Sequence, residues 1–189
     1  MLHRLRRAGC RTETFGYMAA LESFESIKHR LELKISKVAA GEPYFLVGHS
    51  LGGVLIRAAL NSLPENVERP RHVFLLGSPI HSPRLAVRLK DNLLFRALAG
   101  DCGQLLASPP RMSSISALSE RTTSIAGVRG FGRRKGPFGD DPNDGVVSLS
   151  EVSAAWLPDQ KRVPVIHTLL PSSRLTAEAI LREVTANAD

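Results

Sequence analysis

The stretch Phe45 to Leu55, FLVGHSLGGVL, limits what this chain can fold into more than any other part of its sequence. A strand-length apolar run leads directly into Gly-His-Ser-Leu-Gly-Gly, and apolar residues at helical spacing follow. A serine at such a junction sits on a sharp turn with its hydroxyl exposed, and glycines at 48 and 52 remove side chains that would crowd the backbone. The pattern predicts a strand, a turn that presents Ser50 as a nucleophile, and a helix. The alternative is a glycine-rich turn in which the serine is incidental.

Strand-like and helix-like segments alternate along the rest of the chain, which is typical of βαβ units and a mostly parallel sheet. The length of 189 residues suits one domain, residues 1–189. We therefore expect an α/β fold, a three-layer α/β/α sandwich. The expected strands are Thr12–Tyr17, Tyr44–Val47, His72–Leu76, Thr122–Val128 and Val163–Ile166. The expected helices are Leu2–Ala8, Leu21–Val38, one from the glycine turn to about Leu63, Leu85–Leu98 and Leu175–Val184.

Composition excludes several classes of protein. No apolar run approaches the roughly 20 residues of a membrane-spanning helix, and the basic start MLHRLRRAGC lacks the apolar stretch of a signal peptide. We expect a cytoplasmic protein with no integral membrane association. Cys10 and Cys102 are too few for a metal site and have no redox spacing, so both are interpreted as unpaired small hydrophobes.

The net charge of +7 comes from scattered Arg and Lys, with one cluster at Arg129, Arg133, Arg134 and Lys135. Such a surface could attract phosphates, but no nucleic-acid motif or aromatic interleaving accompanies it. We interpret the cluster as a solvated face and do not expect nucleic acid as a partner.

A nucleophilic serine needs a base and a carboxylate that orients the base. Asp144 lies in DPNDGVVS after one expected strand, and His167 lies in VIHTLL after the last. The order Ser, Asp, His is the order of hydrolases that carry this turn. Asp144 could instead only shape an Asp-Gly turn, and Asp140 or Asp141 could be the acid. His167 could be a satisfied core histidine, and we expect His49 to point away from the serine and to pack.

Together, FLVGHSLGGVL, FLLGSP, NDGVVS and VIHTLL resemble the α/β-hydrolase superfamily, particularly its lipase-like and esterase-like members. The resemblance implies Ser50 as nucleophile, His167 as base, Asp144 as acid and the N–H of Leu51 as half of the oxyanion hole. It implies a serine hydrolase acting on a small-molecule or lipid ester, with no cofactor or metal. Residues 81–119 occupy the position of a cap or lid, and some of its apolar residues could line an acyl pocket or be core: Leu93, Leu94, Phe95, Leu105 and Leu106.

The sequence departs from the superfamily in one respect. The second oxyanion donor is expected in a loop after a third strand that lies between the fourth strand, here Thr12–Tyr17, and the fifth, here Tyr44–Val47. We expect that these two strands pair directly, that another chain fills the gap, or that the protein begins upstream of Met1, which we favour. Loss of one donor costs about a hundredfold in rate. The alternative function is therefore a catalytically impaired hydrolase-like module that binds a ligand or partner.

Overall fold

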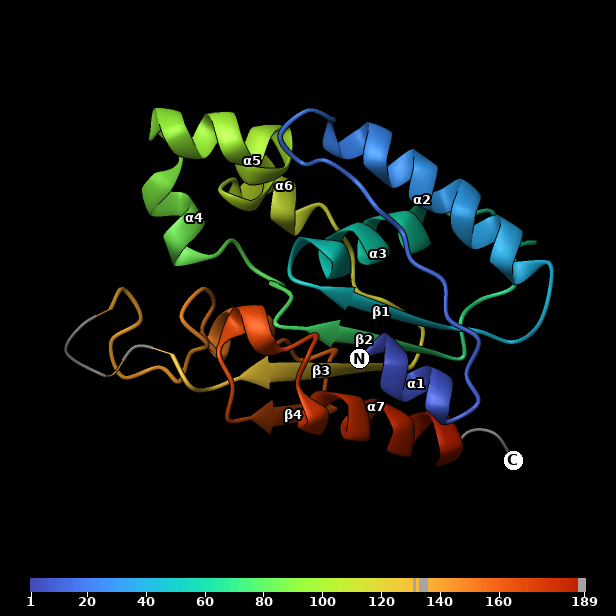
Figure 1. Ribbon diagram of the computed structural model, residues 1–189. Coiled ribbons are helices and arrows are strands. Elements are labelled where there is room, and N and C mark those ends of the chain that lie inside the picture. Colours follow the sequence, from blue (N-terminus) through green and yellow to red (C-terminus); the bar gives the residue numbers. More distant parts are fainter. Residues whose placement is uncertain (131, 133–135, 187–189) are drawn as a thin grey trace.

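The structure, a computed structural model, describes residues 1–130, 132 and 136–186 (Figure 1). Its centre is a parallel sheet with the order β1 (Phe45–His49), β2 (His72–Leu76), β3 (Thr122–Gly127) and β4 (Gln160–Val163). Because all strands are parallel, their carboxyl ends meet at one edge, on the left in Figure 1. Helices cover both faces, which confirms the predicted α/β fold.

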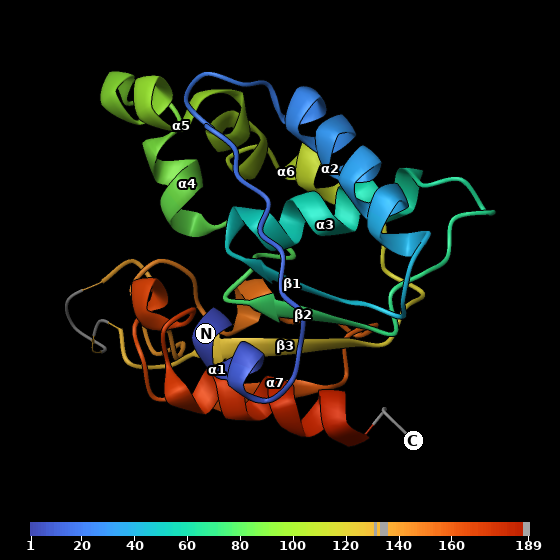
Figure 2. The same cartoon turned by 45° about the vertical axis from the view of Figure 1, so that its right-hand side comes forward.

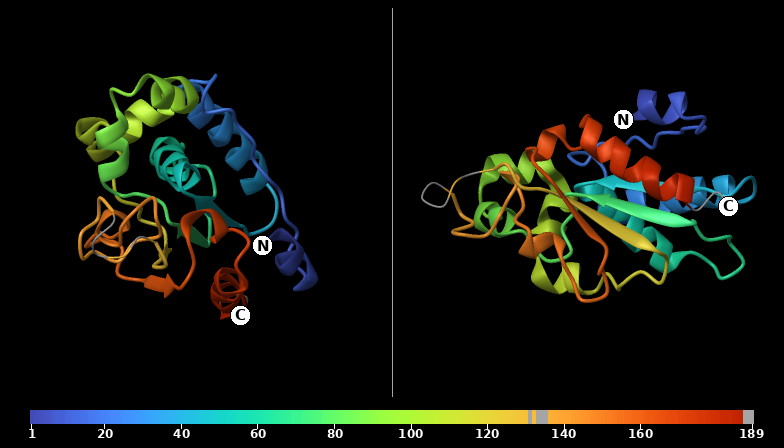
Figure 3. Two further views of the ribbon diagram at one scale, coloured as in Figure 1. Left: turned by 60° about the vertical axis from the view of Figure 1, so that its left-hand side comes forward. Right: turned by 90° about the horizontal axis from the view of Figure 1, so that it is seen from below.

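Side chains of β2 alternate between two apolar clusters, as a strand buried on both faces requires. Val73 and Leu75 belong to the cluster beneath α2 (Phe24–Ala39) and α3 (Leu51–Ser62). Phe74 and Leu76 belong to the opposite cluster. That second cluster lies under α1 (Leu2–Arg7) and α7 (Arg174–Ala186), on the side of the sheet opposite α2 and α3 (left view of Figure 3).

Helix α2 forms where the sequence predicts one, because its apolar residues recur at spacings of three and four. The Ser23 side chain caps its first turn by accepting a hydrogen bond from the N–H of Ser26 at 3.2 Å. The buried face of α2 packs against α3. Helix α3 is itself buried along most of its length between α2 and the sheet. This packing fixes the helix that begins at Ser50.

The expected strand Thr12–Tyr17 is wrong: these residues are irregular, and among the described residues none pairs with them as a strand. Direct pairing of the two strands, one of the three alternatives, is therefore not seen, and among the described residues β1 bonds only to β2. A strand forms only when a neighbour accepts and donates its backbone hydrogen bonds. The segment instead passes from the face covered by α1 to the face covered by α2 (Figure 2).

The single helix expected at 85–98 is two, α4 (Arg84–Leu89) and α5 (Leu93–Leu106), followed by the short α6 (Pro109–Ser113). The Asn92 side chain starts α5 by accepting the N–H of Phe95 at 3.0 Å. The last strand, β4, lies three residues before its expected position, Val163–Ile166. Pro164 has no N–H to continue the ladder, and β4 lies at the edge of the sheet, where polar residues are common.

Among the described residues, none of the helices has the length and apolar character that a membrane span requires.

Candidate active site

Ser50 stands at the junction of β1 and α3 in a strained backbone conformation, with φ 52° and ψ −124°. It is the only residue other than glycine with positive φ in the described part of the chain. Its N–H donates to the carbonyl of Leu76 at 2.9 Å, and its carbonyl accepts the N–H of Gly53 at 3.1 Å and the hydroxyl of Ser78 at 2.7 Å. These bonds hold the turn in a conformation that would otherwise cost about 1 to 3 kcal/mol.

The glycines around Ser50 have different reasons to be glycine. A Cβ on Gly48 would lie 2.5 Å from the Cα of Gly53, and a Cβ on Gly53 would lie 2.3 Å from the Ser78 hydroxyl. Gly52, which the sequence pattern singles out, is less crowded: its Cβ would meet only the Tyr17 hydroxyl, at 3.9 Å. The close approach of α3 to the sheet therefore depends on positions 48 and 53, while a Cβ at position 52 would make an ordinary van der Waals contact.

His167 and Asp144 form a buried pair at the same edge of the sheet. Nδ1 of His167 lies 2.7 Å from Oδ2 of Asp144, and the two residues are 6% and 2% exposed. The other oxygen, Oδ1, accepts the N–H groups of Val146 and Val147 at 3.0 and 2.8 Å. The backbone N–H of His167 also donates to the Asp144 carbonyl at 2.9 Å. The carboxylate is thus fixed by its own turn and orients the imidazole through its second oxygen.

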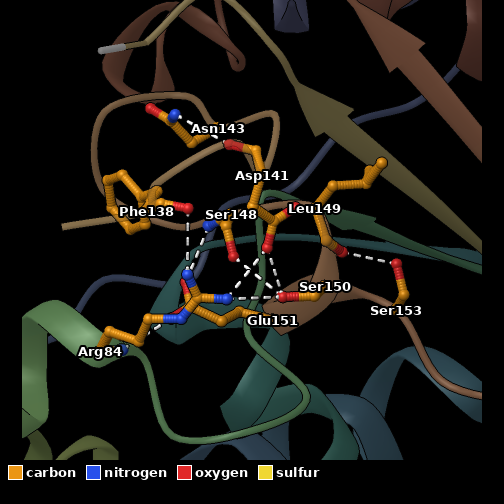
Figure 4. A network of polar contacts seen from close by, with 9 residues as sticks. All are labelled: Arg84, Phe138, Asp141, Asn143, Ser148, Leu149, Ser150, Glu151 and Ser153. Atoms are coloured by element: carbon orange, nitrogen blue, oxygen red, sulfur yellow. Dashed lines mark hydrogen bonds and ion pairs between the residues drawn. The ribbon is translucent and has the colours of Figure 1, made fainter. Parts of the chain in front are cut away.

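Asp141, an alternative acid, takes part in a different network (Figure 4). Its Oδ2 accepts hydrogen bonds from Arg84 at 3.0 Å and from the Ser150 hydroxyl at 2.5 Å. Glu151 joins the same network, because its two oxygens accept the N–H groups of Arg84 and Ser148, each at 2.7 Å. This network ties the loop of Asp144 to the start of α4. Asp140, the other alternative, is exposed.

Gly77, which follows β2, shows how close the pair lies to the serine turn. A Cβ on Gly77 would lie 3.0 Å from Oδ2 of Asp144 and 3.1 Å from Nδ1 of His167. Gly77 directly follows Leu76, whose carbonyl binds the N–H of Ser50. The structure therefore brings Ser50, Asp144 and His167 to one edge of the sheet, although the contacts of the described residues include no direct hydrogen bond from the Ser50 hydroxyl to the His167 ring.

His49 does not point away from the site as expected. Its ring lies 4.7 Å from the His167 ring, and its Nε2 is 3.1 Å from the His167 carbonyl, to which the Nε2–H tautomer donates. Burial lowers the pKa of His49, and the neighbouring His167 lowers it further. The only sequence signal for this contact of His49 is its adjacency to Ser50.

The sequence analysis also missed Arg84 and Glu151, because no sequence pattern links two segments that far apart.

The apolar residues of the possible cap divide between core and surface. Leu105 is buried in the cluster under α3, and Leu106 packs against it. Leu93 and Leu94 are 79% and 68% exposed, and the Phe95 ring lies against Gly103 within α5. Core and surface roles therefore coexist in one segment.

The metal-ligand types, the two cysteines and the basic cluster add no second candidate site among the described residues. Within the described residues, no group of three or more His, Cys, Asp and Glu side chains is placed to hold a metal ion. Cys102 is buried, and Cys10 is half-buried. Of the basic cluster, Arg129 is exposed, whereas Arg133, Arg134 and Lys135 lie outside the described residues.

Comparison with solved structures identifies the fold. Lipase BlEst2 from Bacillus licheniformis, in mature form, matches with a TM-score of 0.66 and 20% identity over 85% of this chain and 74% of that one. Phospholipase PlaB from Legionella pneumophila matches at 0.60 and 14% over 80% and 40%. The metagenomic carboxyl esterase MGS0156 matches at 0.59 and 23% over 85% and 62%.

This chain thus spans less than two thirds of the PlaB and MGS0156 structures. No family model matches the sequence, and a search of curated proteins found no match either. The structural likeness establishes that the chain has the fold of the α/β-hydrolases, as its motifs predict.

Proposed function

We propose that the protein is a serine hydrolase that cleaves carboxylic esters through an acyl-enzyme, with Ser50 as nucleophile, His167 as base and Asp144 as acid. One observation carries this proposal: a strained serine at the start of α3 shares the carboxyl edge of the sheet with a buried histidine-carboxylate pair. Structures with the same fold include a lipase, a phospholipase and a carboxyl esterase, which supports an ester as the substrate.

The bond to Asp144 determines the tautomer of His167. A carboxylate accepts the proton on Nδ1, so Nε2 is left unprotonated and can take the proton of the Ser50 hydroxyl. The serine oxygen then attacks the ester carbonyl, and the imidazolium passes its proton to the departing alcohol. Water, activated by the same Nε2, hydrolyses the acyl-enzyme and restores Ser50. Asp144 stabilises the imidazolium in both halves of the reaction.

The negative charge on the carbonyl oxygen needs hydrogen-bond donors in the transition state. The N–H of Leu51 is the first of α3, and the first N–H groups of a helix have no partner within it. It therefore serves as one donor, helped by the positive end of the helix dipole. Residues 81–119, which the resemblance places at the position of a cap, are tied to the Asp144 loop through Arg84.

A binding module with impaired catalysis is the second candidate. It is favoured by the absence of a direct Ser50–His167 hydrogen bond among the described contacts. A resting enzyme can also lack that bond, since catalytic hydrogen bonds often shorten only when substrate binds. Activity therefore has to separate the two candidates.

The test is labelling by a fluorophosphonate probe, together with a series of p-nitrophenyl esters of increasing acyl length. We expect the parent to label and to hydrolyse esters, and Ser50→Ala to lose both. Ser62→Ala, which removes an exposed hydroxyl at the other end of α3, is the matched control and should behave as the parent. Labelling of Ser50→Ala at the parental level contradicts the nucleophile. A folded parent that neither labels nor hydrolyses any ester favours the binding module.

A further inference from the structure

The irregular segment between α1 and α2 brings a hydroxyl group to the first turn of α3. The Tyr17 hydroxyl lies 3.9 Å from the position that a Cβ on Gly52 would take. Apart from its own helix backbone and chain neighbours, no other atom lies within 4 Å of that position. Side chains on a helix tilt toward its N-terminus. The hydroxyl therefore stands at the end of α3 that carries Ser50 and the N–H of Leu51.

This hydroxyl is a donor without an assigned acceptor. Among the described residues it makes no hydrogen bond, although the ring is half-buried, packs against the core and lies 6.1 Å from the Phe15 ring. Burial raises the pKa of Tyr17, and the nearby Cys102 thiol raises it further. The phenol is thus protonated at neutral pH and keeps its proton available for a hydrogen bond.

The backbone on both sides of Tyr17 is anchored to Arg30 within α2 and to Glu22 just before it. Arg30 donates through Nη2 to the carbonyl of Gly16 at 3.0 Å and pairs with Glu22. Glu22 in turn accepts the N–H of Met18 at 2.7 Å. One ion pair therefore holds the residue before Tyr17 and the residue after it, which limits where the phenol can point without any strand pairing.

We propose that the Tyr17 hydroxyl is the second oxyanion donor of this site, opposite the N–H of Leu51. The inference rests on the proposed serine hydrolase function and deepens it. The resemblance to α/β-hydrolases placed the second donor in a backbone loop after a third strand, and the described residues contain no such strand. A phenol O–H can replace a backbone N–H, because the task is to donate one hydrogen bond to the oxygen as it becomes charged. Tyr17 keeps its proton throughout.

The test is Tyr17→Phe, which keeps the ring and removes only the hydroxyl. We expect kcat for the best p-nitrophenyl ester to fall by about 10- to 100-fold, with KM changed by less than about threefold. Binding of a trifluoromethyl ketone, whose adduct with Ser50 carries the same oxyanion, should weaken by a similar factor. Tyr44 is the only other tyrosine. Its hydroxyl donates to the Glu68 carbonyl away from the site, so Tyr44→Phe is the matched control and should keep the parental kcat.

A second measurement does not depend on how Tyr17→Phe folds. In the Tyr44→Phe background, incorporation of 3,5-difluorotyrosine labels position 17 alone, and fluorine lowers the pKa of the phenol. Activity should then fall as pH rises through this lowered pKa, because a phenolate has no proton to donate.

The outcomes separate the inference from the proposed function. Parental kcat and ketone affinity in Tyr17→Phe, or a rise in KM alone, overturn the role of Tyr17 and leave Ser50 as the nucleophile. An unchanged pH profile of the fluorinated protein overturns it as well. If the parent forms no ketone adduct and hydrolyses no ester, both proposals fall together.

Discussion

Two buried histidines lie at opposite ends of the sheet, and each is linked to a carboxylate. At the carboxyl ends of the strands, His167 contacts Asp144 directly at 2.7 Å. At the amino ends, Nε2 of His72 lies 2.8 Å from the Thr123 hydroxyl, which donates in turn to Asp159. The residue types are the same, and only one pair belongs to a candidate site.

The difference lies in what surrounds each ring. The His72 ring is fully buried, stacks on Phe74 at 4.3 Å and leaves its Nδ1 without a partner. His72 is the first residue of β2, at the end where the strands start rather than end. His167 instead faces the turn where β1 gives way to α3. In parallel sheets the loops at the carboxyl ends collect helix N-termini and reactive side chains. A histidine-carboxylate pair is therefore chemically useful only at that end.

The largest expected contrast is in activity when each histidine is removed. His167→Ala should lower kcat by on the order of 10⁴-fold or more, because the proposed base is lost. His72→Ala should leave kcat within about threefold but lower the free energy of unfolding by about 2 kcal/mol, since it empties a packed buried site. Ester hydrolysis and urea denaturation measure the two effects. If His72→Ala loses activity while its fold is intact, the two histidines are not functionally distinct.

The carboxylates sharpen the same contrast. Asp144→Asn should reduce kcat by roughly 10³- to 10⁴-fold with little change in KM, because an amide favours the wrong tautomer of His167. Asp159→Asn should retain activity, since its partner is the Thr123 hydroxyl. Asp141→Asn is a useful third variant, because Asp141 bonds to Arg84 and Ser150 rather than to the imidazole. A loss in Asp141→Asn as large as in Asp144→Asn would reassign the acid.

The smallest expected effect is a dependence of stability on pH. Burial lowers the pKa of both His72 and His49 below the ordinary value of 6.5. As pH falls, these rings bind protons at a higher pH in the unfolded chain than in the folded one. Their contribution to the free energy of unfolding is therefore complete above pH 6.5 and is lost as pH falls through the lowered pKa values of the folded state. The free energy of unfolding should therefore decrease from pH 7.5 toward pH 5. His72→Gln should decrease less over this interval, and a slope equal to that of the parent would exclude a contribution from His72.

The sequence predicted best where neighbours along the chain decide the structure. His72–Leu76 was predicted with the bounds that β2 has, because a short apolar run buried on both faces needs no further information. The serine turn was predicted because glycine spacing, strand and helix are all local. The order of Ser50, Asp144 and His167 along the chain was also visible in the sequence.

The sequence failed to predict secondary structure where contacts between distant segments of the chain determine it. Thr12–Tyr17 has strand-like composition but no neighbouring strand, and side chains of α2 hold it instead. The residues of β4 are mostly polar and form a strand only because β3 offers a free edge. Gly100 bends α5 with φ 54°, and a Cβ there would lie 2.4 Å from the Ala19 carbonyl. None of these contacts leaves a local sequence pattern.

By itself, the sequence determined the α/β fold and the strained turn at Ser50, since both follow from the apolar period and from where glycine alone fits. Only the tertiary structure decided which aspartate contacts His167. It also decided that the His49 ring packs against the His167 ring. It alone brought the Tyr17 hydroxyl to the start of α3. Such contacts join segments far apart in the chain, and their energy depends on packing and distance rather than on the conformational preference of any one segment.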